Sequence, residues 1–276
     1  MGTVVMSLGP AMTSVYDNIA YVYDSTRYLP NWVADWVAAH VCGQLSRPGQ
    51  VRLLEIGAGT GRIASGFARG DRVGRYVGLD VSPAMLALLR SKLGDAVQTV
   101  VGDACRLPFS ARRFDAVLSC HVLQMIPNLA AALAEIERVL VPGGLYAHCT
   151  NQLALHQQDY DQLWQAILAG EDAAYVPAVR YDMRRDDVVD LWIGRGAQVI
   201  ATQVAQWRTT HRVGDLLAAY EVKAYPSCHQ VTSSIFETSI TRLRHETFRR
   251  YRSLDAELVS TTAIEIVIAL PSRVAT

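Results

Sequence analysis

The stretch VRLLEIGAGTG, residues 51–61, decides the fold of this chain. Leu53, Leu54 and Ile56 form the short apolar run that is typical of a central parallel strand. Glycines at every second position follow, and because they lack a Cβ they allow the backbone to turn sharply and to approach a ligand closely. We expect a helix to begin at Arg62 and to direct its free N–H groups at that ligand. The stretch therefore predicts a nucleotide-type binding loop.

The spacing of the glycines separates two kinds of nucleotide. A dinucleotide loop has the pattern G-x-G-x-x-G, with the third glycine inside the helix and a pyrophosphate at the helix N-terminus. Here Gly57, Gly59 and Gly61 give G-x-G-x-G, and Glu55 stands two positions before the first glycine. A carboxylate at that place suits a cationic amine better than a pyrophosphate. The pattern resembles motif I of the class I S-adenosylmethionine (SAM)-dependent methyltransferases.

The second predicted strand, residues 76–80, ends in a carboxylate. Asp80 at its end is an acceptor-only group, which suits the two hydroxyls of a ribose and repels a 2′-phosphate. SAM and NAD sites share this feature, so it does not separate them. Ser82 and Pro83 then provide an N-cap and a first helical position, and we expect a helix over residues 84–93.

Residues 97–101 predict a third strand, and Gly102, Asp103 and Ala104 come directly after it. In the methyltransferases that motif I resembles, an acid at this place lies at the edge of the adenine. The resemblance implies that Asp103 accepts a hydrogen bond from the exocyclic amine and that the Ala104 N–H donates to a ring nitrogen. The alternative is that Gly102 and Asp103 form a turn and nothing more.

The fourth and fifth predicted strands, residues 114–119 and 145–149, enclose a helix over residues 129–140. The phrase ERVLVPGG, residues 137–144, ends that helix and returns the chain to the sheet, and it is another landmark of the family. Strands and helices thus alternate, which predicts right-handed parallel crossovers. The resemblance covers about residues 15–150 and is closest to the small-molecule branch, which includes the ubiquinone/menaquinone-biosynthesis type.

The segment YDNIAYVYDSTR, residues 16–27, resembles the Y-D-x-x-A-x-x-Y-D opening of small-molecule methyltransferases, which forms a helix or lid over the cofactor. The resemblance implies that Arg27 binds the SAM carboxylate through a charge-assisted bond. It also implies that Tyr23 contacts the same carboxylate or the sulfonium, with Tyr16 as a further candidate. We expect residues 11–30 to order when the cofactor binds. The alternative is a helix that packs inward and leaves Arg27 in solvent.

The second half of the chain predicts the end of the sheet and a cap. Residues 199–207 and 263–270 have strand patterns and fit the antiparallel pair that ends the sheet in the family. The fold class is thus an α/β, Rossmann-like, doubly wound, seven-stranded, mostly parallel sheet with an antiparallel last strand pair and helical cap insertions. Helices are expected over residues 157–168, 183–194, 213–225 and 234–251. Candidates for the cap lining are Trp164, Tyr175, Trp192 and Tyr220, although the pattern favours plain core over ligand contact for each of them.

We divide the chain on this basis into an N-terminal helical lid segment (1–45), a SAM-binding Rossmann-like core (46–151), a cap insertion (152–195) and the final strand pair of the core (196–276) with a helical insertion at 209–255.

The composition disfavours several classes of partner. The 276 residues carry a formal net charge of zero, which gives no electrostatic reason to bind nucleic acid or an anionic membrane. The arginine-rich residues 234–251 are interleaved with acids, which predicts a salt-bridged surface. The five cysteines have no C-x-x-C spacing and predict reduced thiols, with no metal site. We find no leader and no apolar run of transmembrane length, so we expect a cytoplasmic enzyme. A homodimer stays open.

The sequence therefore predicts a SAM-dependent methyltransferase that moves the methyl group in line to a small organic acceptor, uncharged or weakly charged. His121, after the fourth strand, is the candidate general base, and His148 is a weaker one. Two alternatives stay open, a non-methylating SAM-dependent cyclase or decarboxylase and an NAD(P)-binding oxidoreductase or nucleotide-binding partner protein. The resemblance places SAM against Tyr16, Tyr23, Arg27, Glu55, Gly57, Ala58, Gly59, Asp80, Val81, Asp103, Ala104 and Cys120.

Overall fold

The computed structural model describes residues 10–46, 49–152, 154–177 and 185–271. Within these residues, seven strands form one sheet in the order β3-β2-β1-β4-β5-β7-β6. The neighbours among β1 to β5 are parallel, and β7 runs antiparallel to both β5 and β6. The predicted fold class is confirmed, including the antiparallel end of the sheet. The strands are β1 (Val51–Ile56), β2 (Val73–Asp80), β3 (Gln98–Val101), β4 (Phe114–Cys120), β5 (Leu140–Gln152), β6 (Gln198–Arg212) and β7 (Glu257–Leu270).

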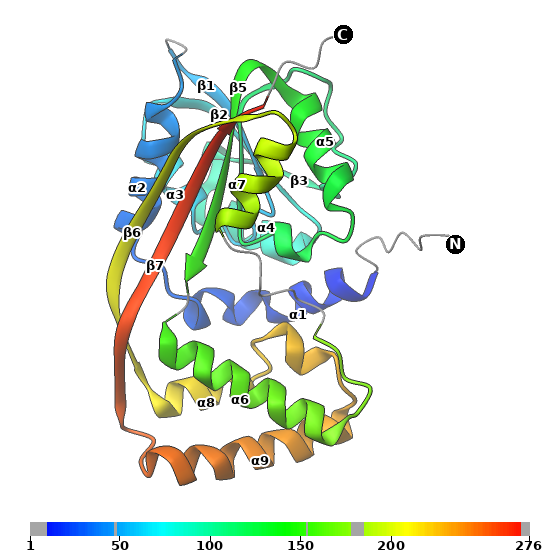
Figure 1. Cartoon of the computed structure of the whole chain (residues 1–276), viewed down its shortest axis with the longest axis vertical. Coiled ribbons are helices and arrows are strands. Elements are labelled where there is room, and N and C mark those ends of the chain that lie inside the picture. Colours follow the sequence, from blue (N-terminus) through cyan, green and yellow to red (C-terminus); the bar gives the residue numbers. More distant parts are fainter. Residues whose placement is uncertain (1–9, 47–48, 153, 178–184, 272–276) are drawn as a thin grey trace.

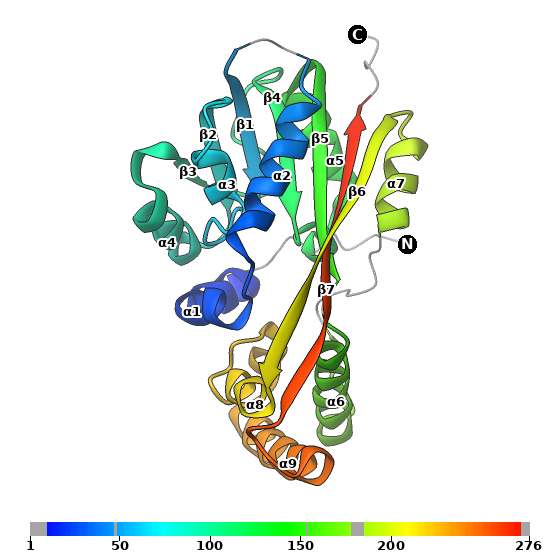
Figure 2. The same cartoon turned by 90° about the vertical axis from the view of Figure 1, so that its left-hand side faces the viewer.

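Helices cover both faces of the sheet (Figures 1 and 2). α2 and α3 pack on one face, and α5 and α7 pack on the other. Because successive strand residues point to opposite faces, Leu53 is buried on the α2 side and Leu54 on the α5 side. The helices are α1 (Pro10–Thr26), α2 (Asn31–Gly43), α3 (Ala64–Ala68), α4 (Pro83–Leu93), α5 (Leu129–Val139), α6 (Leu155–Glu171), α7 (Arg185–Gly194), α8 (Val213–Glu221) and α9 (Ser233–Tyr251).

The helix after the glycine loop begins later than predicted. It starts at Ala64 and not at Arg62. Gly61 has a φ of +81° and its N–H bonds back to the Ala58 carbonyl, which keeps the chain in a turn for two further residues. The next helix begins as predicted, because the Ser82 hydroxyl accepts a hydrogen bond from a backbone N–H in the first turn of α4.

α7 lies on the sheet and not in the cap. Val188 and Trp192 are fully buried there, and the Trp192 ring packs on Tyr146 with a centroid distance of 4.8 Å. The predicted cap insertion over residues 152–195 is therefore too long, because its last helix supplies the layer that covers β5 and β7. The first residues of the helix predicted over 183–194 lie outside the described residues.

β6 and β7 continue as a two-stranded ribbon beyond the end of β5 (Figure 2). β5 pairs with β7 only as far as Ala263, whereas β6 and β7 stay paired to Arg212 and Glu257. The extra length separates the sheet from a second helical layer at the far end of the ribbon (Figure 1).

That second layer, the cap, consists of α6, α8 and α9 and has a hydrophobic core of its own. Trp164 and Tyr220 are buried in this core, and Tyr175 packs half-buried against it. The cap is thus a small packed unit, and these three aromatic residues hold it together.

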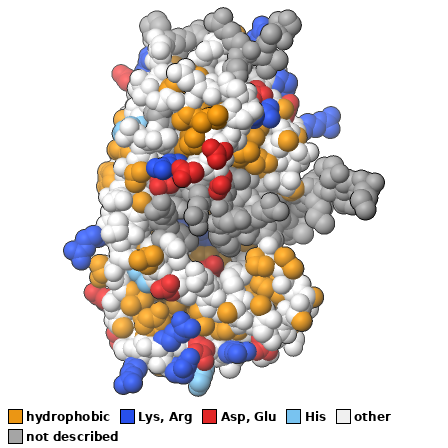
Figure 3. Space-filling view, in the orientation of Figure 1, with side chains coloured by type: hydrophobic (Ala, Val, Ile, Leu, Met, Phe, Trp, Pro, Cys, Tyr) orange, Lys and Arg blue, Asp and Glu red, His pale blue; other side chains and the backbone are white. Residues whose placement is uncertain are grey.

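The surface of the cap carries mixed charge. Basic and acidic side chains lie side by side on it in Figure 3. As predicted, the arginines of α9 form ion pairs, namely Arg242 with Glu171, Arg244 with Glu221 and Arg249 with Glu246. In the described residues no helix is both long enough and apolar enough to cross a bilayer.

Candidate active site

The glycine loop forms the floor of a cavity at the carboxyl ends of the strands. Gly57 and Gly59 both have a positive φ, of +68° and +52°, which disfavours any other residue type. A Cβ at Gly57 would lie 2.6 Å from Cγ2 of Val122, so this glycine allows close packing. A Cβ at Gly59 would meet nothing within 4 Å, because the loop is open to the cavity at that point.

Most of the predicted cofactor residues line this one cavity, although they come from four strand ends and from α1. The predicted residues in the lining are Tyr16, Tyr23, Gly57, Gly59, Asp80, Val81, Ala104, Cys120 and His121. The sequence did not single out the rest of the lining, which is mainly apolar, namely Ile56, Leu79, Met85, Gly102, Val122, Met125 and Ile126.

Asp80 is held by backbone donors at the edge of the cavity. One of its carboxylate oxygens accepts from the Gly59 N–H at 2.8 Å, and the other accepts from the Ser82 N–H at 2.9 Å. Burial raises the pKa of Asp80, and the backbone hydrogen bonds counteract that rise. A carboxylate has about four acceptor positions, more than these backbone donors occupy, so Asp80 is oriented and still able to accept from a ribose.

These residues fit SAM. Asp80 would hold the ribose hydroxyls, the apolar lining would enclose the adenine, and the open backbone at Gly59 would admit the methionine part. The pieces that the sequence predicted separately are thus combined in one place by the parallel topology.

Glu55 does not line the cavity, which corrects its predicted role beside the cationic amine. Strand alternation turns it to the other face from Ile56, where the Tyr76 hydroxyl hydrogen-bonds to its carboxyl group. Complete burial raises the pKa of Glu55 to about 8. The group is therefore mainly neutral at pH 7 and supplies little charge to the site.

Three other predicted residues also lie outside the lining. Asp103 accepts a hydrogen bond from the Cys105 N–H at 2.8 Å, as the turn alternative requires, while its neighbours Gly102 and Ala104 reach the cavity. Ala58, within the glycine loop, packs into the hydrophobic core. Arg27 lies at the cap.

Arg27 connects α1 to the cap. Its guanidinium donates to the Ala224 carbonyl at 3.0 Å and stacks between the rings of Tyr23 and Tyr225, at 4.4 and 4.9 Å from their centroids. The alternative in which Arg27 is simply solvated is wrong. Neither its position nor that of Tyr23 is fixed by local sequence alone, because both depend on the loop after α8.

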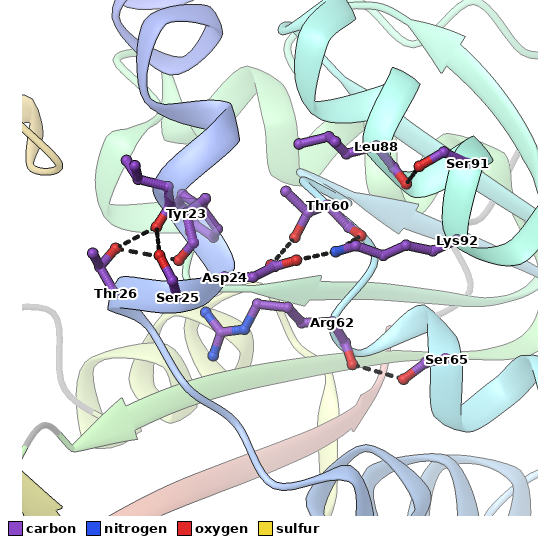
Figure 4. Close-up of polar contacts among 11 residues, drawn as sticks. Tyr23, Asp24, Ser25, Thr26, Thr60, Arg62, Ser65, Leu88, Ser91 and Lys92 are labelled. Atoms are coloured by element: carbon purple, nitrogen blue, oxygen red, sulfur yellow. Dashed lines mark hydrogen bonds and ion pairs between the residues drawn. The ribbon is translucent and has the colours of Figure 1, made fainter.

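α1 is fastened over the cavity by two aspartates that the sequence analysis did not single out. Asp17 accepts from the Ser82 hydroxyl at 2.5 Å, and Asp24 accepts from the Thr60 hydroxyl at 2.5 Å and forms an ion pair with Lys92 (Figure 4). The two aspartates are seven positions apart and so lie on one face of the helix. The repeated Tyr-Asp pair in the sequence is the signal that could have revealed them.

His121 is poorly suited to be the predicted general base. It has a φ of +56°, and its Nε2 accepts from the Asn151 N–H at 3.0 Å, so the neutral ring carries its proton on Nδ1. Burial, together with the charges of Arg62 and Arg27, lowers the pKa of His121 to about 4. The ring is neutral at pH 7 and keeps an Nδ1–H that can donate.

His148 is also excluded as a base. Its two ring nitrogens contact the hydroxyls of Ser119 and Thr150 at 2.9 and 2.8 Å, and it does not line the cavity. Burial lowers the pKa of His148 to about 3. It is a core histidine whose polar atoms are satisfied.

The strand order, the glycine loop and the acid at the end of β2 are those of the class I SAM-dependent methyltransferase fold. Residues 54–148 match the family described as "Methyltransferase domain" (Methyltransf_11). This part of the chain is therefore similar to a methyltransferase domain, and the resemblance seen in the sequence is confirmed.

Two curated proteins illustrate the sequence similarity. The ubiquinone/menaquinone biosynthesis C-methyltransferase UbiE of Desulfotalea psychrophila is 32% identical over 143 residues, which are 51% of this chain and 58% of that protein. A fatty-acid O-methyltransferase of Mycolicibacterium smegmatis is 39% identical over 98 residues, 35% of this chain and 36% of that protein. The chain thus spans less than two thirds of the length of either relative.

Solved structures share the fold at low identity. The [4+2]-cyclase SpnF has a TM-score of 0.58 at 18% identity, with 93% of each chain covered. The YcgJ protein of Bacillus subtilis has a TM-score of 0.52 at 17% identity, with 84% of this chain and 96% of that chain covered. At these identities the likeness concerns the fold alone.

Proposed function

We propose that this chain is a SAM-dependent methyltransferase that transfers a methyl group to a small organic acceptor. The observation that supports this most is the meeting of Gly59 and Asp80 at one cavity, where the loop N–H holds the carboxylate in place. The matching family and the named relatives, all methyltransferases, agree with the proposal. The five free thiols suit the reducing cytoplasm, which we propose as the location.

The protein residues would hold SAM in position and shield the reacting atoms from water. SAM supplies a methyl group on a positively charged sulfur, and in-line attack by the acceptor breaks the S–C bond and leaves the electron pair on sulfur. Asp80 would fix the ribose end and the glycine loop the methionine end, while α1 excludes water from above. Such positioning can contribute about 7–11 kcal/mol to lowering the barrier.

The cavity offers its acceptor no free base. Among the described lining residues, the titratable groups are Tyr16, Tyr23, Asp80, Cys120 and His121. Asp80 is bonded to the loop and its remaining acceptor positions would be taken by the ribose hydroxyls, and the accepting nitrogen of His121 is occupied. The acceptor must then be acidic enough to lose its proton without help, or lose it to water.

Calorimetric titration with SAM, S-adenosylhomocysteine and NADH tests the cofactor. We expect the first two to bind and NADH not to bind. Binding of NADH alone would overturn the proposal in favour of an oxidoreductase.

A second measurement separates methyl transfer from other SAM-dependent chemistry. For an acceptor that the enzyme converts, mass spectrometry should show that S-adenosylhomocysteine and methylated product form in equal amounts. Conversion of an acceptor with SAM left intact would identify a non-methylating enzyme on this fold.

A further inference from the structure

The arginine that follows the glycine loop, Arg62, has a guanidinium that is not satisfied by hydrogen bonds within the described part of the chain. Arg62 forms no ion pair with any described residue, and its Nε is buried without an acceptor. Figure 4 shows its side chain extending from the loop toward α1, with no contact drawn to the guanidinium. A buried donor without an acceptor is costly unless a ligand supplies one.

The nearby carboxylates do not neutralise Arg62. Asp24, the carboxylate drawn with Arg62 in Figure 4, is engaged by Thr60 and Lys92. Glu55 is largely protonated at neutral pH. Asp161 lies in the cap, where it accepts from the Tyr220 hydroxyl.

A second positive charge lies in the same neighbourhood. The guanidinium carbons of Arg27 and Arg62 lie 4.4 and 5.9 Å from the centroid of one ring, that of Tyr23. The positive charges of both arginines also lower the pKa of the buried His121 at the cavity. The surroundings of Tyr23 and His121, which both line the cavity, thus hold two arginines. Neither arginine lines the cavity itself, and neither is paired with a carboxylate among the described residues.

The cofactor would not remove this excess. The amino-acid end of SAM carries one carboxylate and one ammonium and is neutral as a whole, and the sulfonium adds a further positive charge. A negative charge must come from the second substrate. A planar carboxylate matches the fork of a guanidinium better than a neutral group does.

We propose that the acceptor is an organic carboxylate and that Arg62 binds its carboxylate group. This rests on the proposed function and narrows its substrate class. It also revises the expectation of an uncharged or weakly charged acceptor, which came from the net charge of the whole chain. An acceptor that enters as an anion also agrees with a cavity that has no free base.

The test measures binding and does not depend on turnover. The wild-type complex with S-adenosylhomocysteine is titrated calorimetrically with monocarboxylates from benzoate to octanoate and with the matching primary amides. At least one acid should bind 10-fold or more tightly than its amide. Arg62→Gln should remove that preference by weakening the acid alone, and Arg62→Lys should restore part of it.

Arg75→Gln is the matched control, because Arg75 is exposed, hydrogen-bonds to Gln98 and lies at the other end of β2. It should leave the preference unchanged. Equal binding of acids and amides by wild type, no acid bound at all, or an equal loss of acid and amide in Arg62→Gln would each overturn the proposal. Failure of S-adenosylhomocysteine to bind would instead overturn the proposed function.

A second comparison decides whether Arg62 serves the cofactor. S-adenosylhomocysteine and its decarboxylated analogue are titrated into wild type and Arg62→Gln. We expect the two proteins to lose the same factor in affinity when the cofactor carboxylate is removed. If Arg62→Gln loses far less, Arg62 binds the cofactor and the proposal is wrong.

Discussion

The two sides of the cavity differ in how far their polar groups are bonded within the protein. On the side of the sheet, Asp80 accepts from two backbone N–H groups, and Glu55 is hydrogen-bonded to Tyr76 and mainly neutral. On the side of α1 and the cap, Arg62 keeps a buried donor without a partner. The first side is therefore preorganised for a ligand of fixed shape, while the second is incomplete until a ligand of opposite charge binds.

Removing the carboxylate of the preorganised side should have the largest effect. Asp80→Ala deletes a charged acceptor for two hydroxyls, and hydrogen bonds to charged groups contribute about 1.5–3 kcal/mol each. We expect the affinity for S-adenosylhomocysteine to fall by about 100-fold or more. Calorimetry on folded protein measures this, and Asp95→Ala, at an exposed aspartate after α4, is the control. An unchanged affinity in Asp80→Ala would show that this carboxylate does not bind the ribose.

The buried acid on the same side should make stability depend on pH. The pKa of Glu55 is raised from 4.5 to about 8, so the folded protein keeps a proton that the unfolded chain has lost. The stabilisation is fully present below pH 4.5 and is lost as the pH rises toward 8, by about 1.4 kcal/mol per pH unit at most. Denaturant unfolding of wild type and Glu55→Gln from pH 5 to 8 should show this slope in wild type relative to the variant.

Glu135 offers a contrast of opposite sign. The hydrogen bond from Arg138 lowers the pKa of Glu135, so its contribution is present at neutral pH and is lost in acid. The free energy of unfolding of Glu135→Gln should therefore fall furthest below that of wild type near neutral pH. If Glu55→Gln follows wild type at every pH, Glu55 is ionised in the folded protein and the contrast between the two sides disappears.

Two glycines of one loop should separate stability from binding. Gly57→Ala places a methyl group against Val122 at a positive φ, which should cost about 1–3 kcal/mol of stability. Gly59→Ala meets nothing in the protein and should cost about 1–2 kcal/mol from its φ alone, yet it should weaken cofactor binding because the methyl group enters the cavity. Thermal melts and titrations of both variants check this. Normal affinity in Gly59→Ala would mean that the cofactor does not approach the loop.

The fastening of α1 should give the smallest effect. Asp24→Asn removes a half-exposed ion pair with Lys92, a kind of contact that contributes about 0.2–1 kcal/mol. Hydrogen exchange of residues 11–30 should become faster in the variant, and S-adenosylhomocysteine should slow it in both proteins. The control is Asp35→Asn, because Asp35 lies on α2 and forms an exposed ion pair with Arg69. Equal protection with and without ligand contradicts the role of α1 as a lid.

The parts of the site that depend on local chain geometry could be predicted from the sequence. Gly57, Gly59 and Asp80 belong to strand ends, and parallel strands bring their ends to one edge whatever the rest of the chain does. The face on which Glu55 lies was also readable, because alternation places it opposite Ile56, but the prediction followed its charge and not its register.

The parts that depend on distant contacts could not be predicted in this way. Trp192 has the same helical spacing in the sequence as a cap residue, and only its packing on Tyr146 places it in the core. The buried Nε of Arg62 has no acceptor among the described residues, and this depends on which side chains surround it in the folded chain and not on its neighbours in the sequence. A net charge of zero for the chain likewise conceals an imbalance inside the cavity.

The ribbon of β6 and β7 has a consequence for engineering. The insertion that contains α8 and α9 leaves and re-enters the ribbon at Arg212 and Glu257, which are paired across it. Its two ends are therefore adjacent, and a tight hairpin turn could replace everything between them without altering the register of the sheet. A redesigned module grafted at this pair would inherit the glycine loop and Asp80 intact. The buried face of α6, which now packs on α8 and α9, and Arg27, which now contacts Ala224 and Tyr225, would both need new partners.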